Sequence, residues 1–229
     1  MTSPVLKLLA PLAAGLILLS ACGGSSDDAD AKASATPSAS ASPTAAPIDA
    51  DQIACKLVTA ADRTELAGTA VDEIVAASGT DVSSQCRWQA ATALIQVTTL
   101  PAKEWAKSLP DIVTQLESST DTSSAADKKD LAQAKKLLSG AASFTDAQAC
   151  EAFTTLAELG GEKKGATTTV TTVPITETES GISAQICTGG ELTSIIYSIP
   201  DLKETPAIDK TLTSILTSAQ KRAVAAGSK

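Results

Sequence analysis

The sequence lacks histidine altogether, and its aromatic residues number five: Trp88, Trp105, Phe144, Phe153 and Tyr197. Without histidine there is no Ser-His-Asp triad, no imidazole acid–base catalyst and no histidine metal ligand. Surfaces that bind sugars or nucleic-acid bases usually depend on aromatic platforms, so both functions become less favoured. The core must instead be built from Ala, Leu, Ile, Val and the methyl groups of Thr.

Positive charge is also scarce, with 18 Lys and Arg against 26 Asp and Glu and a formal net charge of −8. This balance argues against binding nucleic acid or an anionic membrane through a basic patch. No Gly-x-Ser-x-Gly or Ser-x-x-Lys motif with supporting partners is present, and no calcium loop has the required spacing. We therefore predict a noncatalytic protein with no cofactor and no metal site.

The N-terminal segment, residues 1–21, has the pattern of a signal peptide. Lys7 precedes an apolar run over residues 8–19, which is too short to span ~30 Å of hydrocarbon as a helix. The order Leu19-Ser20-Ala21-Cys22 resembles the bacterial lipobox, in which the cysteine thiol is diacylated and becomes the new N-terminus. We expect Cys22 to anchor the chain to the extracytoplasmic face of the cell membrane.

The segment that follows, residues 22–50, is predicted to be the lipidated cysteine and a disordered tether. Residues 23–47 are almost entirely Gly, Ser, Asp, Ala, Thr and Pro. Such a segment cannot bury enough apolar surface to offset its ordering entropy. Residues 51–229 remain for a single extracytoplasmic domain, which is long enough for a substantial core.

Four cysteines lie in this domain, and an even number in an exported chain predicts two disulfides. Cys55 and Cys150 each lie beside a Thr-capped helix start, while Cys86 and Cys187 each precede a β-rich run, a proline and a helix. These matching contexts favour the pairs Cys55–Cys86 and Cys150–Cys187. Pairing across the halves, or a free reactive thiol pair, remains the alternative.

The element order predicts an α+β fold, with a mostly antiparallel sheet covered by helices. Two similar halves, about residues 51–120 and 143–229, each read as a helix, strands and a closing helix. An extra helix over residues 124–139 joins them, and Pro110 is expected to break or kink the helix over residues 102–117. The predicted strands are residues 71–76, 85–90, 93–100, 167–178, 182–187 and 192–199.

The pattern Cys55-x-Leu57-x-Thr59, followed by Cys86-Arg87-Trp88 at a strand start, resembles a family of actinobacterial envelope lipoproteins classed as domain-of-unknown-function family 3558. The lipobox and tether are similar to those of that family. The resemblance covers mainly residues 50–118, and the second half departs from it because Thr188 follows Cys187. It implies a secreted, cysteine-bridged α+β domain without an established activity or catalytic residues. The two-disulfide plan is also similar to the extracellular sensor domains of mycobacterial receptor kinases, which would imply ligand sensing in a cleft.

We expect this domain to bind a small molecule or lipid of the cell envelope. The alternative is a protein-interaction, sensor or accessory module without a small-molecule ligand. Trp88 and Trp105 are candidate contacts for the ligand or partner, although core packing is the more usual role of each. A small-molecule binder should have an apolar cavity between sheet and helices, whereas an interaction module should have a solid core and an exposed patch.

Overall fold

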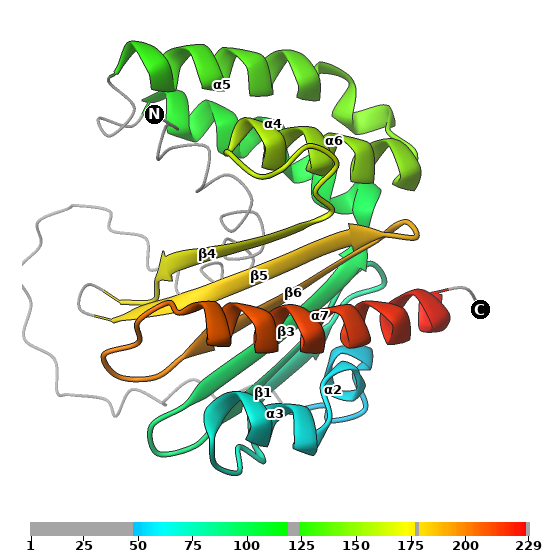
Figure 1. The fold of residues 1–229 in the computed structure, drawn as a ribbon. Coiled ribbons are helices and arrows are strands. Elements are labelled where there is room, and N and C mark those ends of the chain that lie inside the picture. The colour runs from blue at the N-terminus through cyan, green and yellow to red at the C-terminus, as the bar shows by residue number, and fades with distance from the viewer. Residues whose placement is uncertain (1–47, 119–123, 177–178, 228–229) are drawn as a thin grey trace, which may run out of the picture.

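The computed structural model describes residues 48–118, 124–176 and 179–227, and its centre is one six-stranded sheet. The strand order is β1-β2-β3-β6-β5-β4, and every neighbouring pair is antiparallel (Figure 1). Helices pack on both faces of the sheet, and two disulfides join helices to strands. This confirms the predicted α+β class with an antiparallel sheet, covering helices and two disulfides.

Each half of the chain supplies three consecutive strands and a closing helix. The first half contains α2 (Ile53–Leu57), α3 (Ala60–Ala67), β1 (Glu73–Gly79), β2 (Ser84–Gln89), β3 (Leu94–Pro101) and α4 (Ala102–Ser118). The connection contains α5 (Ala125–Leu137) and the 3-10 helix η3 (Leu138–Ser143). The second half contains α6 (Asp146–Leu159), β4 (Thr168–Pro174), β5 (Ser180–Thr188), β6 (Glu191–Ser198) and α7 (Pro206–Gly227).

Local sequence signals set several helix boundaries. The Thr59 hydroxyl accepts the Asp62 N–H and the Asp62 carboxylate accepts the Thr59 N–H, which is a capping box at the start of α3. Thr145 and Gln148 form the same arrangement at the start of α6. Helix α3 ends at Gly68, whose φ of 70° lies in the left-handed region that glycine adopts without a Cβ clash.

Helix α4 continues through Pro110, so of the predicted break or kink at this residue the break does not occur. Proline in a helix interior removes one hydrogen bond and costs about 3 kcal/mol. Leu109, Ile112 and Val113, which flank Pro110, are all buried. Their packing offsets the lost hydrogen bond, which is why tertiary contacts override the local preference.

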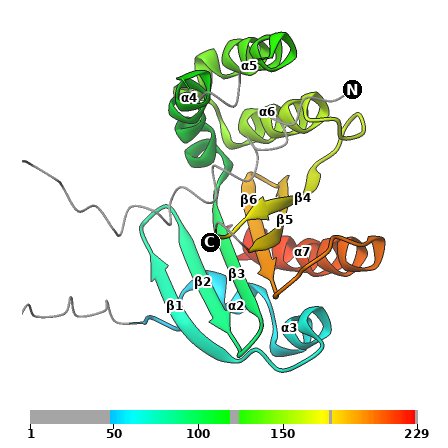
Figure 2. The ribbon, with the colours of Figure 1, turned by 90° about the vertical axis from the view of Figure 1, so that its left-hand side faces the viewer.

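Two apolar clusters form on opposite faces of the sheet. On the first face, which we call the core face, α2, α3 and α7 pack against apolar strand residues. The strand residues of this cluster include Trp88, Ile95, Val97, Ile182, Ile195 and Tyr197. On the other face, α4, α5 and α6 gather at one end of the sheet, where the strands contribute Leu100, Cys187 and Leu192 (Figure 2).

The two halves repeat the order of elements but place their helices on opposite faces. Cys86 and its β3 partner Val97 belong to the cluster on the core face. Cys187 and its β6 partner Leu192 belong to the cluster on the opposite face. The closing helix of each half therefore packs with the cysteine-bearing helix of the other: α7 packs with α2, and α4 packs with α6. The repeat is thus one of element order and not of spatial arrangement.

Candidate functional site on the polar face of the sheet

The sheet face opposite the core face carries a row of polar side chains that crosses all six strands. Alternate residues of a strand point to opposite faces, and residues paired in register share a face. The row that neighbours Leu100 and Leu192 consists, in spatial order, of Ser78, Gln85, Thr98, Ser194, Gln185 and Thr169. Every member is a hydroxyl or a carboxamide, which is unusual for a sheet centre.

The next row on the same face continues this character. It consists of Ala76, Arg87, Gln96, Ile196, Ser183 and Thr171. These twelve positions are called the polar face below. The polar face spans the whole width of the sheet, and it borders the end that α4 and α6 cover.

The central residues of the polar face are buried, yet some of their polar atoms have no partner. Ser183 and Gln185 are each 1% exposed. The Ser183 hydroxyl and both the nitrogen and oxygen of the Gln185 amide lack a hydrogen-bond partner. Because an unsatisfied buried polar group costs roughly 1–3 kcal/mol, such groups are candidates for ligand contact.

Arg87 supplies the positive charge of the polar face, and its Nε donates to Gln96 Oε1 at 3.0 Å. Gln96 itself is 2% exposed, so this contact holds the stem of the guanidinium in place. The motif Cys86-Arg87-Trp88 is thus divided between the two faces. Cys86 and Trp88 belong to the core cluster, and Arg87 points the other way.

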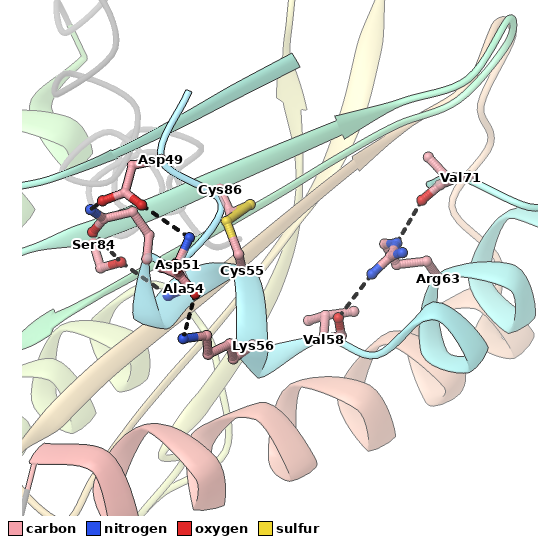
Figure 3. The surroundings of a disulfide bond; sticks show 11 residues. Asp49, Asp51, Ala54, Cys55, Lys56, Val58, Arg63, Val71, Ser84 and Cys86 are labelled. Carbon is pink, nitrogen blue, oxygen red and sulfur yellow. Dashed lines mark hydrogen bonds and ion pairs between the residues drawn. A yellow bond between two sulfur atoms is a disulfide. The ribbon is translucent and has the colours of Figure 1, made fainter. Parts of the chain in front are cut away.

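Trp88 lies in the core beside the first disulfide and is 2% exposed. The Arg63 guanidinium lies 4.7 Å from its ring centroid, a cation–π distance. Arg63 also donates to the carbonyls of Val71, at 2.6 Å, and Val58, at 3.1 Å (Figure 3). The predicted contact residue Trp88 is therefore part of a structural unit with the Cys55 bridge, whose Cα–Cα distance is 5.0 Å.

Trp105 lies in the cluster on the other side of the sheet, near the second disulfide. It is 1% exposed, and its ring centroid is 5.5 Å from that of Phe153. Its indole N–H has no hydrogen-bond partner. Trp105 shares this cluster with Leu100, Cys187 and Leu192, the row that borders the polar face. Unpartnered buried polar atoms of Trp105, Ser183 and Gln185 thus lie on the same side of the sheet.

The titrating groups with shifted pKa values lie away from the polar face. Burial alone would raise the pKa of Asp62, but hydrogen bonds from Thr59 and Arg222, with the Arg222 charge, lower it below its ordinary value. Burial, with the nearby Asp146 carboxylate, raises the pKa of Glu191 against the opposing effect of Lys103. Among the described residues, no group of three His, Cys, Asp or Glu side chains could hold a metal ion.

Sequence reasoning found the strands of the polar face but not the face itself. In β2, the polar residues Gln85, Arg87 and Gln89 alternate with residues that point to the core face. In β5, Ser183 and Gln185 alternate with apolar residues in the same way. This period-two pattern was the available signal. Alternation normally predicts a solvent-exposed side, so it does not by itself distinguish a buried polar row.

The predicted signal peptide, Cys22 and the tether up to residue 47 lie outside the described residues. Among the helices of residues 48–118, 124–176 and 179–227, none is long and apolar enough to cross a membrane. No family model, no curated protein and no solved structure matches the chain. The resemblance to the family of unknown function therefore stays a prediction.

Proposed function

We propose that this chain is a lipid-anchored extracytoplasmic protein whose domain binds a small polar molecule of the cell envelope on the polar face, without catalysis. The observation that carries the proposal is the buried, unpartnered amide of Gln185 beside the unpartnered hydroxyl of Ser183. A ligand that donates and accepts hydrogen bonds would satisfy all three atoms.

A polar ligand fits the domain better than a lipid chain does. The apolar strand residues Ile95, Val97 and Ile195 pack in the cluster that contains α2 and α7. The rows on the other face consist mainly of hydroxyl and carboxamide side chains. Burying an alkyl chain against such groups would leave them without hydrogen bonds, which opposes binding.

Anchoring through Cys22 rests on the lipobox pattern Leu19-Ser20-Ala21-Cys22. We expect Cys22→Ala to move the protein from the membrane fraction to the medium and to remove the acyl mass from its N-terminus. A membrane-bound variant with an unchanged N-terminal mass would contradict the anchor.

Ligand binding is tested by native mass spectrometry of the full chain, produced in an actinobacterial host and extracted in mild detergent. We expect a small polar molecule to co-purify with the wild type and to be lost from the double variant Ser183→Val/Gln185→Leu. The matched control is Gln115→Leu, because Gln115 is exposed on α4. A ligand-free wild type, or equal occupancy in the double variant, would contradict the proposed site.

One observation favours a protein-interaction function as the second candidate. Ile48, Ile53 and Val82 are 50%, 45% and 47% exposed. Val82 lies in the β1–β2 turn, and Ile53 follows Gln52, whose side-chain oxygen accepts a hydrogen bond from Ser84 on β2. Exposed large apolar residues close to one hairpin can contribute to an interaction site. A ligand-free wild type that crosslinks to an envelope protein from position 82 would favour this function.

A further inference from the structure

The edge strand β4 has the features of a surface that pairs with another strand. We infer that two copies of this chain associate through β4, with the two strands antiparallel, so that their sheets join into one. This inference is independent of the polar face and of any ligand bound there. It depends on the open side of β4, on the symmetry of its sequence and on the charges at its two ends.

The outer side of β4 presents main-chain groups that have no strand partner. β4 is the last strand of the sheet (Figure 1). The Cys187 N–H donates to the Thr167 carbonyl at 3.0 Å, and with the register of the pairing this shows that odd-numbered residues of β4 bond to β5. The N–H and C=O groups of Thr168, Val170 and Thr172 therefore point outward. No other backbone group of the described residues bonds to them.

The two edges of the sheet differ in how well they resist such pairing. β1, the other edge strand, begins at Glu73 and has a register shift between Ile74 and Ala76. Bulges and charged side chains discourage pairing between sheet edges. β4 pairs with β5 without a register shift, and it contains no charged side chain. Pro174 ends the strand, and the residues before it are all Thr or Val, which favour strands.

The sequence of β4 is symmetric about Val170. Residues 168–172 read Thr-Thr-Val-Thr-Thr in both directions. When two copies pair antiparallel about this centre, Thr168 lies opposite Thr172 of the second copy, and the two Val170 side chains are neighbours. The outward groups of these three residues then meet and form about six hydrogen bonds. A twofold contact requires such self-complementarity, because each copy presents the same surface.

The charges at the two ends of β4 are complementary in this arrangement. Before the strand, the exposed Lys163 and Lys164 outnumber Glu162, and after it the exposed Glu179 lies in the turn to β5. Antiparallel pairing places the basic end of one strand beside the acidic end of the other. A chain of net charge −8 otherwise repels its own copy, so this complementarity favours β4 as the surface of contact. Because exposed ion pairs are screened by salt, association should weaken as salt rises.

The first test is disulfide crosslinking of the full chain in mild detergent, with one cysteine introduced in β4. In the proposed register the two copies of residue 170 are directly opposite, with Cα atoms about 5.5 Å apart, which a disulfide can bridge. We expect Val170→Cys to form a covalent dimer on mild oxidation. Thr172→Cys is the matched control, because its two copies lie roughly 14 Å apart along the strands. It should crosslink only when mixed with Thr168→Cys.

The second test measures association by sedimentation velocity over a concentration series that reaches roughly 1 mM, where weak contacts form. The double variant Lys163→Glu/Lys164→Glu should weaken association by roughly tenfold, and adding Glu179→Lys should restore it. The matched control is Lys128→Glu/Lys129→Glu, which makes the same change in net charge on exposed residues of α5. It should weaken association much less, because α5 lies away from β4.

Peptide mapping identifies the crosslinked position and checks that both native disulfides remain intact. Absence of a covalent dimer from Val170→Cys, or equal crosslinking of Thr172→Cys alone, would overturn the inference. A wild type that stays monomeric throughout the concentration series would also overturn it. If residue 170 crosslinks to a different protein while the wild type is monomeric, β4 pairs with another chain and the second copy is the wrong partner.

Discussion

Replacing Gln185 with leucine should stabilise the ligand-free domain while it removes the proposed ligand contact. The side chain is 1% exposed, and neither its nitrogen nor its oxygen has a hydrogen-bond partner. Most substitutions of buried residues destabilise a protein. An increase in stability at this position would therefore identify a residue whose chemistry serves binding at the expense of folding.

The size of the effect follows from the two orphaned atoms. Each unsatisfied buried polar atom costs roughly 1–3 kcal/mol, and leucine has neither atom. Imperfect fit of the branched side chain removes part of the gain, typically less than 1.5 kcal/mol. We expect the free energy of unfolding to rise by about 2 kcal/mol. For a domain of this size, that corresponds to an increase in Tm of roughly 4–8 °C.

The assay is urea denaturation, in which the midpoint should rise while the slope of free energy against urea stays unchanged. Gln220→Leu is the matched control, because Gln220 is also buried, at 3% exposure. Its Nε2 donates to the carbonyls of Thr188 and Glu191, at 2.8 Å each, whereas its Oε1 has no partner. Leucine there removes two hydrogen bonds and one unpartnered atom, so the free energy of unfolding should fall by about 1 kcal/mol.

The two glutamine variants must therefore change stability in opposite directions. If Gln185→Leu lowers the free energy of unfolding as much as Gln220→Leu does, the Gln185 amide is satisfied in solution. The argument for a ligand contact at Gln185 would then be lost.

Three further predictions concern the scaffold. The double variant Cys150→Ala/Cys187→Ala opens a loop of 37 residues. Urea denaturation should show that the free energy of unfolding falls by about 4 kcal/mol. A loss below about 1 kcal/mol would contradict a stabilising role of this disulfide. Arg63→Lys removes the guanidinium that contacts two carbonyls and the Trp88 ring. We expect the free energy of unfolding to fall by about 2–3 kcal/mol and the near-UV circular dichroism of Trp88 to change. An unchanged urea midpoint would contradict this stabilising role of Arg63. The lowered pKa of Asp62 contributes stability above its unfolded pKa, which is lost as pH falls through the folded value. Asp62→Asn should accordingly lose less stability than the wild type between pH 7 and pH 3, and parallel pH profiles would refute this.

Local signals were sufficient to predict most of the elements. The Thr59 and Thr145 capping boxes require only residues three positions apart. The disulfide pairs Cys55–Cys86 and Cys150–Cys187 were also predicted correctly, because each cysteine has a counterpart in a similar local context. The break allowed for at Pro110 does not occur, because nonlocal packing holds its helix.

The polar face could not be predicted because it depends on which strands are neighbours. Gln185 and Thr98 belong to one row only because β6 lies between β3 and β5. Strand order is a nonlocal property, and alternating polar residues within one strand are typical of any sheet with a solvent-exposed side. The same limit explains why the opposite placement of Cys86 and Cys187 was not foreseen.

The exchange of closing helices between the halves also constrains when the chain can fold. Ala54 and Leu57 of α2 are buried in the cluster that contains Leu212 and Leu216 of α7, more than 150 residues later. The first half therefore has no complete core while the C-terminal helix is still being synthesised, and this topology delays folding until the last helix is present. Truncation within α7 should consequently expose the first half to proteases, although the cut lies far from it in sequence.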